Sequence, residues 1–175
     1  MTDDSSALPT SPAQLLDRLT TLGIGHHTVE HPPLFTVEDS KALRGTLPGT
    51  HIKNLFLRDR RETMYLVVAQ EDRRIDLKAL GEILGAGKLS FGSAGRLMTY
   101  LGVLPGAVTP LAAINDTAGR VSVWLDRTIL EGGTVHCHPL VNTMTTALAP
   151  EDLVKFLHAT GHEPFLIDLP APPPA

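Results

Sequence analysis

The chain has little cysteine, few aromatic residues and no long apolar run, and each shortage excludes a class of protein. A single cysteine in 175 residues cannot form an internal disulfide, so a reducing cytoplasm is the expected location. Aromatic residues make up 5%, which leaves few rings for stacking on bases. No apolar run approaches the roughly 18 residues that span a bilayer, and the acidic start MTDDSSALPTSP does not resemble a signal peptide. No membrane partner is therefore expected.

The chain also lacks an excess of basic residues. Its formal net charge is −4 and its pI is about 6.0, whereas a protein that coats long nucleic acid carries a basic stripe. This balance still allows a protein that holds only the end of a nucleic acid. Hydrophobic residues make up 42% of the chain, which is enough to bury a core of ordinary size.

Helix-like and strand-like segments alternate irregularly along the sequence. Helical spacing and capping residues predict helices at 11–22, 36–43, 76–84, 93–101 and 150–159. Strands are predicted at 26–31, 51–57, 64–69, 88–91, 120–125, 134–138 and 143–148. The mixture predicts an α+β fold, a single compact domain over residues 11–169 with a central mixed β-sheet flanked by helices. Residues 1–10 and the proline-rich 170–175 are expected to be disordered tails.

The only cysteine lies between two histidines in HCHPLVN, residues 136–142. On a strand, His136 and His138 point to one face and Cys137 to the other. Two histidines fall short of the three or four protein ligands of a zinc site, and neither HExxH nor CxxC occurs. No metal and no cofactor are therefore expected. Cys137 is expected to be a small buried side chain, because neither flanking histidine is placed to act as its base.

Two polar residues, Lys53 and Asn54, interrupt the otherwise apolar strand HIKNLFL, residues 51–57. The strand has two interpretations. It is either an edge strand with a solvated lysine, or it places Lys53 at the rim of a pocket. At a rim, the ammonium group would hold a phosphate or carboxylate as a point charge.

The segment GVLPGAVTP, residues 102–110, contains two glycines and two prolines and cannot form regular structure. It is either a plain connector or a binding loop. Glycine allows the backbone to approach a ligand closely, and proline stiffens the loop. Exposed backbone N–H groups in such a loop can form an oxyanion hole.

Four motifs together carry a resemblance to a known family: HPPLFTVEDS (31–40), HIKNLFLRD (51–59), KLSFGSAGRLMTYLGVLPGAVTP (88–110) and HPLVNTMTT (138–146). With them the chain resembles the bacterial prolyl-tRNA editing proteins of the YbaK and ProRS-associated (INS-like) deacylase superfamily. The match is closest to the free-standing branch that clears alanyl-tRNA(Pro). The resemblance spans residues 25–168.

This resemblance implies a compact α+β editing domain that hydrolyses a mischarged aminoacyl-tRNA, Ala-tRNA(Pro), in trans. In that family the motif lysine is needed for activity, which makes Lys53 the candidate catalytic lysine. The GxxxP loop lines the acyl site, which assigns Gly106 to catalysis and Pro110 to substrate binding. An aminoacyl ester is already activated, so its hydrolysis needs a positioned water and a stabilised oxyanion rather than a metal or a thiol.

The resemblance also assigns residues to the pocket for the amino acid. His138 is expected to form its wall, so that alanine enters and the larger proline ring is excluded. Thr36, Asn54 and Asn142 are expected to bind substrate as well. The water is activated either by a protein group or by a hydroxyl of the substrate.

Other functions remain open from the sequence. The chain is also compatible with a deacylase of another mischarged tRNA, such as Cys-tRNA(Pro), or with a non-catalytic module that binds aminoacyl-tRNA or a synthetase. The expected partner is the acceptor end of tRNA(Pro), with prolyl-tRNA synthetase as a further partner that the resemblance suggests. The chain is expected to be a monomer.

Overall fold

A computed structural model describes residues 8–34 and 37–169 of the chain. Its α-helices are α1 (Pro12–Thr21), α2 (Val37–Thr46), α3 (Leu77–Leu84), α4 (Ala94–Leu101) and α5 (Pro150–Ala159). Its strands are β1 (His26–Glu30), β2 (Thr50–Arg58), β3 (Met64–Gln70), β4 (Ser90–Phe91), β5 (Val121–Asp126), β6 (Val135–Cys137), β7 (Met144–Leu148) and β8 (Phe165–Ile167). Two 3₁₀ helices, η2 (Pro110–Asn115) and η3 (Arg127–Glu131), complete the described elements.

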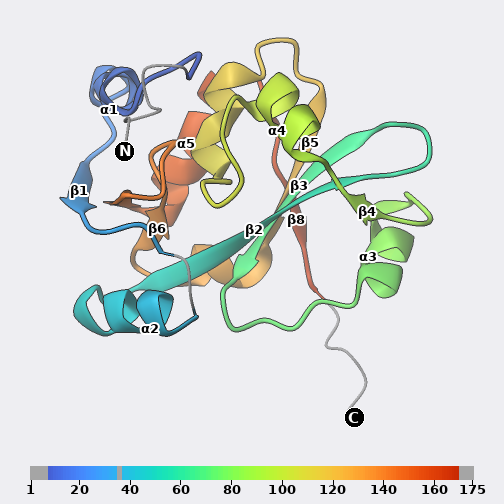
Figure 1. The fold of residues 1–175 in the computed structure, drawn as a ribbon, viewed down its shortest axis with the longest axis horizontal. Coiled ribbons are helices and arrows are strands. Elements are labelled where there is room, and N and C mark those ends of the chain that lie inside the picture. The colour runs from blue at the N-terminus through green and yellow to red at the C-terminus, as the bar shows by residue number, and fades with distance from the viewer. Residues whose placement is uncertain (1–7, 35–36, 170–175) are drawn as a thin grey trace.

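The strands form one mixed sheet, which confirms the expected α+β fold. Its order is β1-β7-β6-β2-β3-β5-β8, and β4 pairs with β2 beside this path. The β2–β3 hairpin is antiparallel and crosses the molecule in Figure 1, whereas β6 joins β2, and β5 joins β3, in parallel. Among the described residues, no helix is long and apolar enough to span a membrane.

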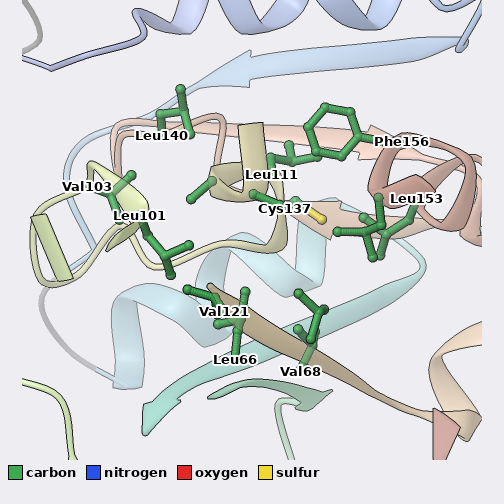
Figure 2. Packing of buried hydrophobic residues seen from close by; sticks show 14 of the residues in the cluster. Leu66, Val68, Leu101, Val103, Leu111, Val121, Cys137, Leu140, Leu153 and Phe156 are labelled. Atoms are coloured by element: carbon green, nitrogen blue, oxygen red, sulfur yellow. The ribbon is translucent and has the colours of Figure 1, made fainter. Parts of the chain in front are cut away.

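Strand β3, MYLVVAQ, is buried on both faces and divides the core in two. Leu66 and Val68 belong to a large cluster that is covered by α1, α4, α5 and η2. Tyr65 and Val67 point the other way, into a smaller cluster beneath α3. The alternation follows from the period of two in a strand. Figure 2 shows the large cluster, with Leu66 and Val68 opposite leucines of the helical layer.

Three helices, α1, α3 and α4, begin at the capping residues that the sequence predicts. Ser11 accepts a hydrogen bond from the Gln14 N–H at 3.1 Å, and the Gln14 side chain accepts one from the Ser11 N–H, which completes a capping box on α1. Asp76 caps α3 by accepting from the Lys78 and Ala79 N–H groups, and Ser93 caps α4 by accepting from the Arg96 N–H. These caps explain why the sequence located these helices correctly.

Three elements were not expected from the sequence: β8, η2 and η3. The N-terminal tail also differs from the expectation at residues 8–10. Leu8 packs against the large core, and the Thr10 hydroxyl donates to Asn115 Oδ1 at 2.6 Å. The remainder of both expected tails, residues 1–7 and 170–175, lies outside the described residues.

Candidate functional site

The sheet opens along one edge of β2, and a cavity lies there. Strand β6 pairs with β2 only at Thr50 and His51, and β4 pairs with it only at Leu57 and Arg58. No described strand pairs with this edge between those points. The cavity has a volume of about 200 Å³ and is lined by Leu34, Leu43, His51, Ile52, Asn54, Glu71, Gly106, His136, Cys137, His138 and Thr145. It is small, since cavities for drug-sized ligands begin near roughly 300 Å³.

Three of the residues expected in the site line this cavity, although they come from distant parts of the chain. Asn54 lies on β2, Gly106 in the loop before η2, and His138 directly after β6. Asn142 adjoins them, because a Cβ atom on Gly106 would lie 3.5 Å from Asn142 Nδ2. The fold therefore brings four of the expected residues together.

Gly106 lies in a tight turn whose geometry requires glycine. The Ala107 N–H donates to the Leu104 carbonyl at 3.0 Å, and Gly106 has a φ of +90°. Proline at the second position and a positive φ at the third are typical of a type II turn. The loop is therefore stiff at the point where it meets the cavity.

His138 is held in one tautomer by the backbone. Its Nδ1 lies 3.0 Å from the Met144 carbonyl oxygen, which can only accept, so Nδ1 carries the proton and Nε2 is the acceptor. Burial lowers the pKa of His138, and the neighbouring His31 lowers it further, while the bond to Met144 opposes both effects. The ring is therefore neutral at neutral pH. The turn after it contains Leu140, which is buried at a φ of +72°, an outlier for a bulky residue.

His51 and His136 form a stacked pair on the cavity wall. Their ring centroids lie 4.5 Å apart with an interplanar angle of 18°. Nε2 of His51 donates to the Leu47 carbonyl at 2.8 Å, and Nε2 of His136 donates to the Pro48 carbonyl at 3.0 Å. Burial lowers the pKa of His136, and the adjacent His51 adds to this effect, while the bond to Pro48 opposes it. His136 thus keeps Nδ1 as its acceptor nitrogen.

Lys53 does not line the cavity, although its neighbours Ile52 and Asn54 do. Strand alternation directs its side chain to the opposite face of β2, where Leu55 joins the smaller core. Its ammonium group donates a hydrogen bond to the Arg73 carbonyl, in the segment after β3. In this conformation the lysine ties β2 to that segment.

The two remaining expected residues have different positions. Pro110 is buried at the start of η2, where the Thr109 side chain caps the helix, and it does not line the cavity. Pro110 therefore fixes the end of the loop without contacting the cavity. Thr36 lies outside the described residues.

Cys137 belongs to the large core as well as to the cavity wall. It is 2% exposed, and in Figure 2 its sulfur lies among the labelled side chains of that cluster. Burial raises the pKa of its thiol to about 12, which disfavours the thiolate that a nucleophile requires. In the described part of the chain, no three His, Cys, Asp or Glu side chains are grouped so as to hold a metal ion.

Several contacts of the cavity could not be predicted from the sequence. Glu71 and Thr145 line it, and His51 and His136 meet only because β2 and β6 pair in parallel at those positions. Thr145 is further connected to His31, whose Nε2 lies 2.8 Å from the threonine hydroxyl. The spacing of residues in the sequence does not reveal which distant strands pair with one another.

Comparison with known proteins places this geometry in a family. Residues 31–156 match the family model described as the aminoacyl-tRNA editing domain. Prolyl-tRNA synthetase associated domain-containing protein 1 of Mus musculus is 41% identical over 161 residues, covering 89% of this chain and 95% of its own. The prolyl-tRNA editing protein ProX of Acetoanaerobium sticklandii is 38% identical over 149 residues, covering 85% and 91%.

A solved structure agrees on the fold. The crystal structure of a candidate trans-editing enzyme for prolyl-tRNA synthetase superposes with a TM-score of 0.70 at 21% identity, over 92% of this chain and 98% of that one. The relatives include vertebrate as well as bacterial proteins, so the resemblance is not restricted to bacteria. The editing-domain match covers most of the chain, from the residue after β1 into α5, and includes every described residue of the cavity. The chain belongs to the aminoacyl-tRNA editing domain family.

Proposed function

We propose that this protein hydrolyses the ester of mischarged Ala-tRNA(Pro) in trans and so removes alanine from the tRNA. The similarity to a protein named for prolyl-tRNA editing supports tRNA(Pro) as the tRNA part of the substrate. The observation that carries the proposal is the cavity of about 200 Å³, where Asn54, Gly106 and His138 meet. A cavity of that size suits a small acyl group and the ribose edge that carries it.

The reaction requires one water molecule and no second substrate. The water oxygen bonds to the ester carbonyl carbon, the ester C–O bond breaks, and the leaving ribose oxygen takes up a proton from the water. Free alanine and tRNA result. Because the ester is already activated, positioning and oxyanion stabilisation carry most of the catalysis.

The Gly106 turn is the proposed source of oxyanion stabilisation. The Ala107 N–H is already donated to Leu104, which leaves the Gly106 N–H as the candidate donor from this turn. His138 offers Nε2 as an acceptor, since its Nδ1 is bonded to Met144. Nε2 can orient the water or the free ribose hydroxyl, and the imidazole forms the wall against proline.

Lys53 remains the proposed catalytic lysine, and its contact makes the proposal testable. To reach a phosphate or hydroxyl of the terminal adenosine, its ammonium group has to leave the Arg73 carbonyl. Lys53→Ala is expected to abolish deacylation while the midpoint of urea unfolding stays close to that of the wild type. A variant that loses stability but keeps its turnover would instead make Lys53 a structural tether.

One deacylation panel tests the proposed function. The purified protein is offered Ala-, Cys-, Ser- and Pro-tRNA(Pro), each with and without a chelator. We expect hydrolysis of Ala-tRNA(Pro), spared Pro-tRNA(Pro) and no effect of the chelator. Preferential hydrolysis of Cys-tRNA(Pro) would instead make the protein a deacylase of that mischarged tRNA. Tight binding of aminoacyl-tRNA without hydrolysis would make the chain a binding module.

A further inference from the structure

Two buried acceptor atoms that lack a hydrogen-bond partner belong to residues that line the cavity. Among the described residues, the buried side-chain polar atoms that lack a hydrogen bond are Asn54 Oδ1, Arg58 Nε, Asp126 Oδ2 and His136 Nδ1. The first and last belong to residues that line the cavity. Buried polar atoms are nearly always paired in folded proteins, so such a pair in one cavity points to a ligand.

Both atoms accept hydrogen bonds, which defines the chemistry of that ligand. Nδ1 of His136 is an acceptor because Nε2 donates to Pro48, and the residue is only 7% exposed. The ring is held in place, because it stacks on His51 and its Nε2 is bonded to the Pro48 carbonyl. An amide oxygen accepts as well. The ligand group must therefore donate at least two hydrogen bonds.

The charge of the cavity selects among donors. Among the described residues, its lining includes the carboxylate of Glu71 and neither lysine nor arginine. Burial and the neighbouring His51 lower the pKa of His136, so this ring adds no positive charge at neutral pH. A carboxylate in the wall is more compatible with a cationic donor than with an anionic group such as a phosphate.

An aminoacyl ester carries one group of this kind, its α-ammonium. We propose that Asn54 Oδ1 and His136 Nδ1 bind the α-ammonium group of the substrate, which makes His136 a specificity-determining residue alongside the wall formed by His138. This inference rests on the proposed function. It adds that the cavity recognises the free amine of the acyl group in addition to its size.

The test compares two acyl groups in two kinds of variant. Propionyl-tRNA(Pro) is alanyl-tRNA(Pro) with a hydrogen in place of the ammonium group. His136→Phe keeps a stacked ring but removes the acceptor. Asn54→Leu removes the amide at similar volume, and Asn54→Asp restores an acceptor oxygen. His158→Phe is the matched control, because His158 lies on the surface of α5, paired with Glu163.

The expected result is a penalty that depends on the acyl group. His136→Phe and Asn54→Leu should lower kcat/KM for the alanyl ester by roughly 10- to 100-fold, because each removes a hydrogen bond to a charged group. In the same variants, kcat/KM for the propionyl ester should fall by less than about threefold, because this ester has no ammonium group that could lose a hydrogen-bond partner. Asn54→Asp should recover alanyl activity, and His158→Phe should match the wild type.

Equal penalties for both esters would overturn the inference, because the two acceptors would then bind a group common to both, such as a ribose hydroxyl. If the wild type hydrolyses neither ester, the proposed function fails, and binding decides the inference instead. The probes are the stable amides 3′-alanylamino-3′-deoxyadenosine and its propionyl counterpart, followed by NMR titration. The inference requires tighter binding of the alanyl amide by the wild type and a loss of that preference in His136→Phe.

Discussion

At the scale of single residues, the backbone fixes the chemistry of the site. Carbonyl groups of Leu47, Pro48 and Met144 each accept from one histidine and thereby fix its tautomer. The cavity consequently presents acceptor nitrogens in fixed positions, as pre-organised sites require. The sequence showed that the histidines of HCHPLVN share a face, but it contained nothing about the carbonyl groups that orient them.

Gly106 offers a residue-scale prediction with a matched control. Gly106→Ala and Gly119→Ala both place a side chain at a positive φ, +90° and +65°, and neither new Cβ meets an atom closer than 3.4 Å. Each should cost about 1 kcal/mol of stability for that reason. Only Gly106→Ala should lower kcat/KM, because Gly119 lies away from the cavity. Equal activity of the two variants in deacylation assays would exclude a role for the Gly106 turn.

His138 should control selectivity through its volume. His138→Ala enlarges the cavity where we place the wall, so hydrolysis of Pro-tRNA(Pro) should rise relative to Ala-tRNA(Pro). Missing volume of this kind typically changes discrimination by roughly 10- to 200-fold. The measurement is the ratio of kcat/KM values for the two esters, with His158→Ala as the surface control. An unchanged ratio would show that another residue excludes proline.

At the scale of elements, strand β2 organises the site by changing partners. It pairs with β6 at its start and with β4 at its end, and the cavity lies between. Local patterns located β2, β3 and the capped helices, because period and capping are local properties. They could not show that β6 pairs with β2 in parallel, and they missed β8, whose three residues Phe165–Ile167 pair with β5 only through tertiary contact.

The docking of α3 supplies an element-scale prediction. A Cβ atom on Gly81 would lie 2.0 Å from the Gly87 carbonyl oxygen, so Gly81→Ala must displace α3 or the loop after it. We expect a loss of about 2 kcal/mol or more in the free energy of unfolding, as overpacking against backbone commonly costs. Gly95→Ala in α4 meets no close backbone atom, and it should be neutral or stabilise by about 0.5 kcal/mol. Urea unfolding of both variants checks the contrast, and similar stabilities would contradict the close packing of α3.

At the scale of the whole molecule, the fold holds two histidines, His136 and His138, in their neutral form. Burial is the largest cause of the lowered pKa of both His136 and His138, with His51 and His31 as their respective neighbours. A histidine with a lowered folded-state pKa contributes stability above its unfolded value near 6.5, and this stability is lost as the pH falls through the folded value. The free energy of unfolding should therefore decrease below about pH 6.5.

Measurement of urea unfolding at a series of pH values from 7.5 to about 5 checks this dependence, since the unfolded histidine titrates in that range. His136→Phe removes one of the two groups and should flatten the curve. His158→Phe, altered only at the surface, should retain the slope of the wild type. A wild-type protein equally stable across this range would show that the two rings are not held neutral.

At this scale, charge and composition set limits that depend on the sequence alone. The net charge of −4 argues against a nucleic-acid coat and leaves open a protein that holds only the end of a nucleic acid. The side-chain direction of Lys53 could not be predicted from charge and composition, because it depends on which face of β2 each core cluster covers. The motif that contains Lys53 was recognisable, but its contact with Arg73 was not.

The central claim is that the cavity beside β2 admits alanine on tRNA(Pro) and excludes proline. Its most direct test is a multiple-turnover assay of the wild-type protein on Ala-tRNA(Pro) and Pro-tRNA(Pro), each compared with spontaneous hydrolysis. We expect that a catalytic amount of protein deacylates Ala-tRNA(Pro) repeatedly and leaves Pro-tRNA(Pro) at the spontaneous rate. Spontaneous rates for both esters, or equal acceleration of both, would contradict it.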